Sequence, residues 1–393
     1  MPNDPIVILS ARRTAIGSLL GQFTPVTSPQ LGAAAIKAAV ADSSIQPEDI
    51  GEVIMGCVLP AAVGQAPARQ AALGAGLPKS VGCTTVNKVC GSGMKAVMLA
   101  HDLITAGAAD LMVAGGMESM TNAPHMLHAR VGIKYGEAKL IDHMAWDGLT
   151  NPYDGQAMGV CGELCAEKFH FTRAQQDAFA TESVKRAQRA IKDGSFKAEI
   201  VAVNVKTRKG EVTVDTDEEP GRCDITKIPT LKPAFKKDGG TVTAASSSSI
   251  SDGAAALVLM RESLAKQKGL KPFARILGHS SFAQEPVWFT TSPVSAIDRL
   301  QKKLGWAEKN VDLYEINEAF AVVAMAAMHE LKLPHAKVNV NGGACALGHP
   351  IGCSGARLIV TLLHALKARN LKHGIASLCI GGGEATAIAV ELL

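Results

Sequence analysis

The sequence predicts an α/β fold with a duplicated core, in which two mixed sheets are layered with helices and related by a pseudo-twofold axis. Strand-like and helix-like stretches alternate along the chain, an order that favours parallel or mixed sheets covered by helices. The first and last thirds of the chain repeat one order of turn, helix, strand and glycines. At 393 residues, the chain also exceeds the size at which a single core usually keeps growing.

The repeat is visible in two stretches of similar length. Residues 90–116 run from a glycine-rich turn through an apolar, helix-like stretch to a strand-like stretch that ends in glycines. Residues 353–383 follow the same order, and an extended segment precedes each copy, at 52–57 and at 311–317. Because the strands of the two copies are equivalent, we expect the loops at their ends to converge on one active site.

The order of these segments predicts four parts of the chain. Residues 1–120 form the N-terminal core half, and residues 271–393 form the C-terminal core half. Residues 121–240 are less regular and carry charged stretches, so we expect a loop or lid domain inserted in the N-terminal half. Residues 241–270 then return the chain to that half.

Charge, hydropathy and cysteine content exclude several classes of protein. The formal net charge of +4 is spread along the chain without a basic run, so we expect no nucleic-acid partner. No apolar run reaches about 18 residues, and the N-terminal segment leads straight into a strand-like stretch, so we expect neither a membrane span nor a secretory signal. The nine cysteines lack the paired spacing of a zinc site, which predicts reduced thiols, no metal and a cytoplasmic location.

Cys90 is the first candidate for chemistry. It stands directly before Gly-Ser-Gly and an apolar helix-like stretch, so its sulfur is expected at a helix N-terminus. Unpaired N–H groups and the helix dipole stabilise a thiolate there, as a nucleophile requires. Taken alone, such a cysteine is more often a small buried thiol beside a packing turn.

Three further segments carry candidate catalytic groups. His349 lies in a loop rich in glycine and proline, and histidine is the natural base for a thiol near neutral pH, although a purely structural hydrogen bond explains this loop equally well. Cys379 closes an apolar strand-like run before three glycines whose N–H groups can face an anion, yet a buried strand thiol is the more ordinary explanation. Asn317 can orient a water or a carbonyl, but an N-cap role is again more ordinary.

Four motifs carry these residues, and together they resemble the thiolase family along practically the whole chain. They are Asn87-Lys-Val-Cys-Gly-Ser-Gly-Met-Lys95, Asn317-Glu-Ala-Phe320, Asn341-Gly-Gly with Gly348-His-Pro-Ile-Gly352, and Cys379-Ile-Gly-Gly-Gly383. Four independent motifs in the family's order are specific, and they outweigh the ordinary explanation of each one alone. The resemblance implies a five-layer αβαβα core with a loop domain.

The resemblance also implies the role of each catalytic residue. Cys90 accepts the acyl group, His349 deprotonates Cys90, and Cys379 moves the proton at the α-carbon of the second acetyl group. In similar enzymes His349 and a water held by Asn317 stabilise the enolate oxygen. The N–H groups of Cys90 and Gly381 serve the acyl oxyanion. The matching contacts to coenzyme A, by resemblance, are Arg222, Ser248, Met158, Leu149, Phe235, Ala319 and Phe320.

The implied activity is a reversible Claisen condensation of two acetyl-CoA molecules to acetoacetyl-CoA and CoA, through an acyl-cysteine in a ping-pong scheme. The partners are these thioesters, no cofactor is tightly bound, and a homotetramer is expected, with a dimer as the second choice. Ala157 stands where short-chain thiolases usually have histidine. This difference leaves open a broader-chain 3-ketoacyl-CoA thiolase of fatty-acid degradation.

Two other classes fit the sequence less well. A ketoacyl synthase has a similar fold and cysteine, but it would normally place a histidine where this chain has Asn317, and it needs no cysteine at position 379. A catalytically dead lipid-binding relative would be expected to lose Cys90, His349 or Cys379, and all three are present.

Overall fold

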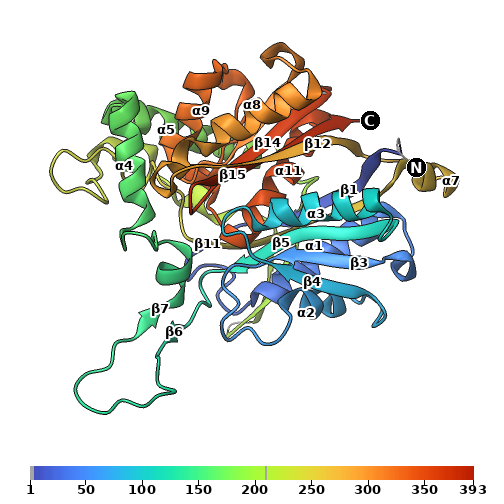
Figure 1. Cartoon of the computed structure of the whole chain (residues 1–393), viewed down its shortest axis with the longest axis horizontal. Helices are drawn as coiled ribbons and strands as arrows, with labels where there is room; N and C mark the ends of the chain where they lie inside the picture. The colour runs from blue at the N-terminus through green and yellow to red at the C-terminus, as the bar shows by residue number, and fades with distance from the viewer. Residues whose placement is uncertain (1–3, 209) are drawn as a thin grey trace.

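The main sheet joins both halves of the chain. A computed structural model describes residues 4–208 and 210–393 (Figure 1). Within these residues the sheet has 11 strands, and its main path follows the order β13-β14-β15-β12-β1-β11-β5-β3-β4. The strands of this path are β1 (Ile6–Thr14), β3 (Glu52–Gly56), β4 (Gly82–Val86), β5 (Leu111–Ser119), β11 (Ser251–Arg261), β12 (Ala274–Ala283), β13 (Leu313–Ile316), β14 (His373–Ile380) and β15 (Glu384–Leu392).

The strand pairing repeats in the two halves, as the sequence predicts. In the first half β3 runs parallel to both β4 and β5, and β5 is antiparallel to β11. In the second half β13 runs parallel to β14, a single parallel bridge joins Tyr314 to Val338, and β14 is antiparallel to β15. The halves meet where β1 pairs with β12 over only two positions, Val7 with Arg275 and Ile8 with Ala274.

Helices separate and cover the two halves of the sheet, which confirms the five-layer αβαβα arrangement (Figure 1). The central helices α3 (Ser92–Ala106) and α11 (Ile351–Ala368) share one buried apolar cluster with strands of both halves. A second cluster packs α1 (Ser28–Ser43) and α2 (Pro67–Gly74) on the outer face of the first half. A third packs α8 (Ser292–Leu304) and α9 (Ala321–Leu331) on the outer face of the second half.

The helix α11 is apolar because it lies in the middle of the protein. By length and hydropathy it is the one described helix that would suit a membrane span. Most of it is buried inside the fold, so packing between the sheets accounts for its composition.

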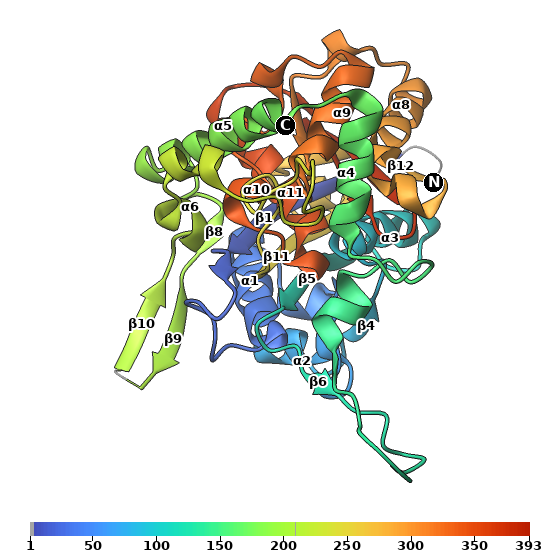
Figure 2. The same cartoon turned by 90° about the vertical axis from the view of Figure 1, so that its left-hand side faces the viewer.

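Most of the segment between β5 and β11 lies outside the main sheet and carries its own elements, although its strand β8 pairs with β1. Two parts of it project from the body of the molecule, the loop between β6 and β7 and the hairpin of β9 and β10 (Figure 2). The rest packs over the ends of the strands, where Thr172 and Gln175 form a capping box at the start of α5. The elements are β6 (His125–Met126), β7 (Ile141–Asp142), a π-helix (Met144–Gly148), α4 (Met158–Phe169), α5 (Arg173–Lys192), β8 (Ile200–Val201), β9 (Val203–Thr207), β10 (Gly210–Val214) and α6 (Glu218–Arg222).

Candidate active site

The loop between β4 and α3 presents Cys90. Asn87 accepts a hydrogen bond from the N–H of Val89, and the hydroxyl of Ser92 donates to the carbonyl of Val89. These bonds hold Val89 at a φ of 46°, in the left-handed region that a β-branched residue rarely adopts. Strain of this kind persists where surrounding contacts enforce it, often at functional sites. Helix α3 begins two residues after Cys90, so the predicted helix N-terminus is confirmed.

The thiol of Cys90 is more enclosed than the sequence suggests. Its own N–H and the N–H of Gly381 hydrogen-bond the sulfur, and both bonds lower the pKa. Burial acts in the opposite direction and dominates, raising the pKa of Cys90 to about 11. Desolvation therefore outweighs the two N–H groups, and the thiol of Cys90 keeps its proton at neutral pH. A base must take the proton when Cys90 reacts.

Cys379 lies near Cys90 at the end of β14. Its side chain is fully buried, and burial raises the pKa of its thiol well above the ordinary value. The neighbouring Cys90 raises the pKa further, which places the two thiols within electrostatic reach of each other. A turn follows β14 with Gly382 at a φ of 91°, where glycine is the favoured residue. This turn directs the N–H of Gly381 toward the Cys90 thiol.

His349 is held by the loop before α11. Gly348 has a φ of 100°, and a Cβ there would lie 2.0 Å from the hydroxyl of Ser251, so only glycine fits. The Nδ1 atom of His349 lies 2.6 Å from the hydroxyl of Ser354, which donates to the carbonyl of Pro350. Burial, followed by the charge of Arg357, lowers the pKa of His349 to about 3. The imidazole is therefore neutral at neutral pH and can accept a proton.

Asn317 lies beside His349. Its Nδ2 atom is 3.4 Å from Nε2 of His349 and 3.5 Å from Nδ1. Helix α9 begins only at Ala321 with Phe320 as the N-cap, so the N-cap explanation for Asn317 is wrong. The Oδ1 atom of Asn317 is buried and has no hydrogen-bond partner among the described residues. A buried acceptor of this kind suits a water or a ligand.

The structure thus brings together the ends of four segments from both halves of the chain. The arrangement offers two thiols, one neutral imidazole and one amide in a mostly buried setting. Such a set can form an acyl-enzyme and move protons on either side of it.

Six of the seven expected contacts to coenzyme A gather around these groups. The N–H of Met158 donates to the carbonyl of Leu149, and Leu149 packs in one apolar cluster with Cys90. Phe320 meets Phe235 edge to face, with ring centroids 5.9 Å apart, in a cluster that includes Cys379. The remaining two are neighbours, because the N–H of Ser248 donates to the carbonyl of Ala319 at 3.0 Å.

Arg222 lies apart from that group. It is exposed at the end of α6 and forms an ion pair with Glu218, one turn earlier, at 3.3 Å. The structure does not bring it into contact with the other six within the described residues. Helix α6 does lie near α10 (Ala344–Leu347), the short helix that leads into the His349 loop.

Two carboxylates near the site were not singled out from the sequence. Glu118 is fully buried and accepts hydrogen bonds from the N–H groups of Val58, Leu59 and Gly352, so it ties the loop after β3 to the start of α11. Burial raises the pKa of Glu118 to about 7. The sequence signal that could have revealed Glu118 is an acidic residue inside an otherwise apolar strand. A carboxylate buried there requires hydrogen-bond donors around it.

Glu384 is the second carboxylate. It pairs with Lys88, so it links the turn after β14 to the loop that presents Cys90. Its partner is 296 positions away, which no local pattern reveals.

Comparison with known proteins identifies the family. The family model described as "Thiolase, N-terminal domain" matches residues 6–263. The family model described as "Thiolase, C-terminal domain" matches residues 270–392. The chain belongs to the thiolase family. This thiolase is 51% identical over 395 residues to acetyl-CoA acetyltransferase 2 of Arabidopsis thaliana, spanning 100% of this chain and 98% of the relative. It is 49% identical to the acetyl-CoA acetyltransferase of Cupriavidus necator, over 98% of this chain and 99% of the relative.

Two solved thiolase structures are similar along the whole chain. The Acat5 thiolase from Ascaris suum in complex with coenzyme A superposes with a TM-score of 0.94 at 43% identity, covering 99% of this chain and 100% of that one. The acetyl-CoA acetyltransferase of Bacillus anthracis superposes with a TM-score of 0.96 at 40% identity, covering 99% of both chains.

Proposed function

We propose that this thiolase catalyses the reversible condensation of two acetyl-CoA molecules to acetoacetyl-CoA and CoA. The observation that carries the proposal is the pair of neighbouring thiols, Cys90 and Cys379, together with a His349 that burial keeps neutral. A carbon–carbon bond formed between two thioesters needs both a nucleophile and a separate base for the α-carbon. Relatives named acetyl-CoA acetyltransferase that span the full chain support the same reaction.

The first half-reaction transfers an acetyl group to Cys90. His349 takes the thiol proton as the sulfur attacks the thioester carbon of acetyl-CoA. The N–H groups of Cys90 and Gly381 stabilise the oxyanion, and loss of one such donor typically costs about 10²–10³ in rate. The bond to the sulfur of CoA then breaks, and Cys379 gives its proton to the leaving thiolate. Free CoA departs, and Cys379 remains as a thiolate.

The second half-reaction forms the carbon–carbon bond. The Cys379 thiolate removes an α-proton from a second acetyl-CoA, and the enolate oxygen is stabilised by His349 and by a water bound to Asn317. The enolate carbon attacks the acetyl group on Cys90, the carbon–sulfur bond breaks, and the proton on His349 returns to Cys90. Acetoacetyl-CoA leaves, and all groups regain their initial protonation.

Coenzyme A thioesters are the proposed ligands, with no other cofactor required by these steps. Met158 and Phe235 pack in one apolar cluster with Cys379, and Leu149 packs in another with Cys90, so apolar contacts lie next to both thiols. Arg222 is expected to reach the anionic part of CoA only by leaving Glu218. Ala157 caps α4 without a side-chain bond and has a smaller side chain than the histidine usual in short-chain thiolases, so the second candidate function is a broader-chain 3-ketoacyl-CoA thiolase.

Steady-state thiolysis of 3-ketoacyl-CoA thioesters of increasing chain length tests the proposal. We expect the highest kcat/KM for acetoacetyl-CoA and a steady decline for longer chains. Higher kcat/KM for medium or long chains than for acetoacetyl-CoA would replace the first candidate with the second. An Ala157→His variant provides the matched comparison, because a histidine there should narrow the acyl space.

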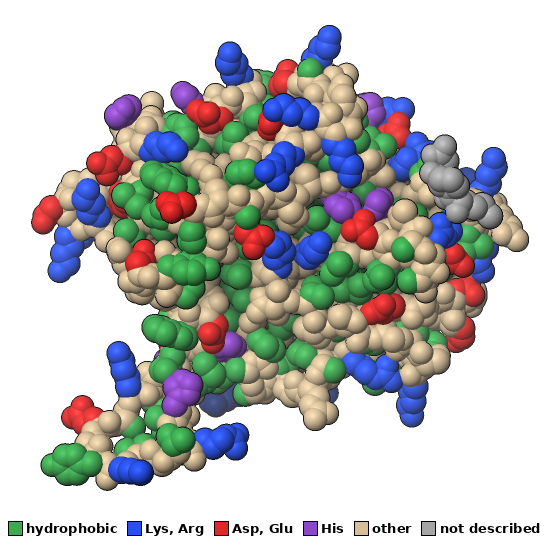
Figure 3. All heavy atoms as spheres, in the orientation of Figure 1, with side chains coloured by type: hydrophobic (Ala, Val, Ile, Leu, Met, Phe, Trp, Pro, Cys, Tyr) green, Lys and Arg blue, Asp and Glu red, His purple; other side chains and the backbone are tan. Residues whose placement is uncertain are grey.

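Assembly as a homotetramer is part of the same proposal. The projecting loop between β6 and β7 exposes apolar side chains that a monomer would leave in water (Figure 3). They are Leu127, Val131, Ile133, Tyr135 and Leu140. Light scattering should report four chains per particle, and a stable monomer at micromolar concentration would contradict the proposal. The cytoplasmic location and a place in fatty-acid metabolism stay predictions.

A further inference from the structure

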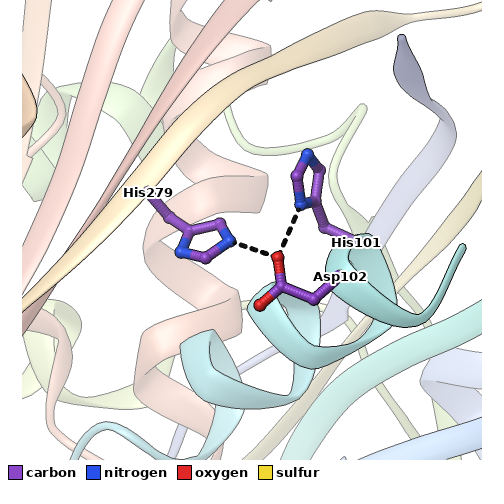
Figure 4. Close-up of side chains that lie close together, drawn as sticks. All are labelled: His101, Asp102 and His279. Atoms are coloured by element: carbon purple, nitrogen blue, oxygen red, sulfur yellow. Dashed lines mark hydrogen bonds and ion pairs between the residues drawn. The ribbon is translucent and has the colours of Figure 1, made fainter. Parts of the chain in front are cut away.

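Two histidines and an aspartate that the reaction does not use meet where the central layer contacts the second half of the sheet. His101 and Asp102 lie on α3, and His279 lies on β12 (Figure 4). Oδ1 of Asp102 is 3.1 Å from Nδ1 of His101 and 2.8 Å from Nε2 of His279. These three atoms all lie within 4.8 Å of one another, and the two rings meet edge to face.

We propose that His101, Asp102 and His279 form a binding site for a divalent transition metal ion, with Zn²⁺ as the best match. Imidazole nitrogen and carboxylate oxygen are ordinary zinc ligands, with bonds of about 2.0–2.2 Å. Ligand atoms around one tetrahedral ion at that distance lie about 3.3 Å apart. The carboxylate oxygen lies 2.8 Å and 3.1 Å from the two ring nitrogens, close to that value, and all three ligand atoms lie within 4.8 Å of one another.

The hydrogen bonds to Asp102 already aim both rings at one point. In the metal-free protein each ring points the nitrogen nearest Asp102 at the same carboxylate oxygen. A metal-bound His101 carries a proton only on Nε2, and a metal-bound His279 only on Nδ1, because the nitrogen beside Asp102 must offer its lone pair to the ion. The two lone pairs and the carboxylate then face one ion.

The site is open to solvent, and it lies between helix α3 and the second half of the core. The Asp102 side chain is 50% exposed, which provides an entry path for the ion from solvent. Helix α3 begins just after Cys90, and β12 belongs to the other half of the core. An ion bound here would fasten the helix that follows the nucleophile to the opposite half and would stabilise the folded protein. His279 lies 177 positions from Asp102, so ligand spacing in the sequence could not reveal the site.

Crystals of the full-length protein soaked in Zn²⁺ and measured on both sides of the zinc absorption edge test the site directly. We expect an anomalous peak about 2.0–2.2 Å from the three ligand atoms. A peak only at cysteine sulfurs, or no peak near these residues, would overturn the proposal and leave the cluster as a hydrogen-bonded clamp.

Thermal unfolding with and without Zn²⁺ provides the second test, in the wild type, Asp102→Asn and His279→Gln. A matched control is His329→Gln, which changes an exposed histidine paired with Glu330 away from the cluster. Zn²⁺ should raise the Tm of the wild type and the control, while each site variant should bind at least about tenfold more weakly. A zinc-induced shift that is equal in all four proteins would contradict the proposal. Without zinc, the condensation activity of the wild type, the two site variants and the control variant should be the same.

Discussion

The hydroxyl of Ser354 lies between two groups of the same loop, 2.6 Å from Nδ1 of His349 and donating to the carbonyl of Pro350 at 2.9 Å. A hydroxyl has a single proton, so its bond to Pro350 fixes the proton of His349 on Nδ1. Nε2 is then left as the proton acceptor. Ser354 therefore acts as a positioning residue for the base that Cys90 requires.

Ser354→Ala should lower kcat with little change in KM. The variant leaves the Nδ1–H donor of His349 without its partner, at a cost of about 1–3 kcal/mol, which corresponds to roughly a 5- to 150-fold loss in rate. Ser354→Thr keeps a hydroxyl and should recover much of the activity. Steady-state kinetics of both variants check the prediction, and an alanine variant with normal kcat would remove Ser354 from this role.

The ion pair of Lys88 and Glu384 links the loops that carry Cys90 and Gly381. Because its side chains are partly exposed, we expect the coupling energy to stay below about 1 kcal/mol. Glu384→Gln should therefore reduce kcat by no more than about fivefold, and high salt should shrink the difference. A double-mutant cycle with Lys88→Gln measures the coupling. Purely additive effects of the two substitutions would show that the pair does not hold the loops together.

Glu118 should contribute an unusual pH dependence to stability. Burial raises the pKa of this carboxyl from 4.5 to about 7, so the folded protein keeps a proton that the unfolded chain has released. The stability from this group is present below pH 4.5 and is lost as the pH rises through about 7. The difference in unfolding free energy between wild type and Glu118→Gln should therefore decrease as the pH rises. Denaturant titrations across this range check it, and a constant difference would contradict the assigned pKa.

The parts of the fold that the sequence predicted are those with local signals. The glycines around Cys90, followed by apolar residues, predicted the start of α3, and the matching order after Cys353 predicted α11 and β14. Helix α3 begins at Ser92, close to the expected position, whereas α11 begins at Ile351, before Cys353 and earlier than expected. The brief pairing of β1 with β12 that joins the two halves was not predicted, since edge-to-edge contact depends on how whole sheets pack.

In the candidate site, too, features with a local sequence motif were predicted, whereas features that depend on distant segments were not. Motif residues such as Asn317 and His349 were named from the sequence, and the structure brings them together. The raised pKa of Cys90 was not predicted, because desolvation arises from many segments that enclose one sulfur. The bond of Glu118 to Gly352 was also missed, because those residues are 234 positions apart.

Replacement of Cys90 and replacement of Cys379 should abolish different steps of the reaction. Cys379→Ala should still accept acetyl from acetyl-CoA at Cys90, since the nucleophile and His349 remain. Exchange of the α-protons with solvent and overall turnover should fall by roughly 10²–10⁴ from the loss of acid–base catalysis alone. Proton exchange followed by NMR, beside the overall synthesis rate, separates the two steps. Near-normal synthesis of acetoacetyl-CoA by this variant would mean that His349 moves the proton alone.

The most direct test of the account is the identity of the acylated residue. The protein is exposed briefly to acetyl-CoA without a second substrate, quenched in acid, digested and examined by mass spectrometry. The account predicts one acetyl group per active site on Cys90, and none on Cys90→Ala treated in the same way. Acetyl found on a different cysteine, or absent from an enzyme that still makes acetoacetyl-CoA, would contradict Cys90 as the nucleophile.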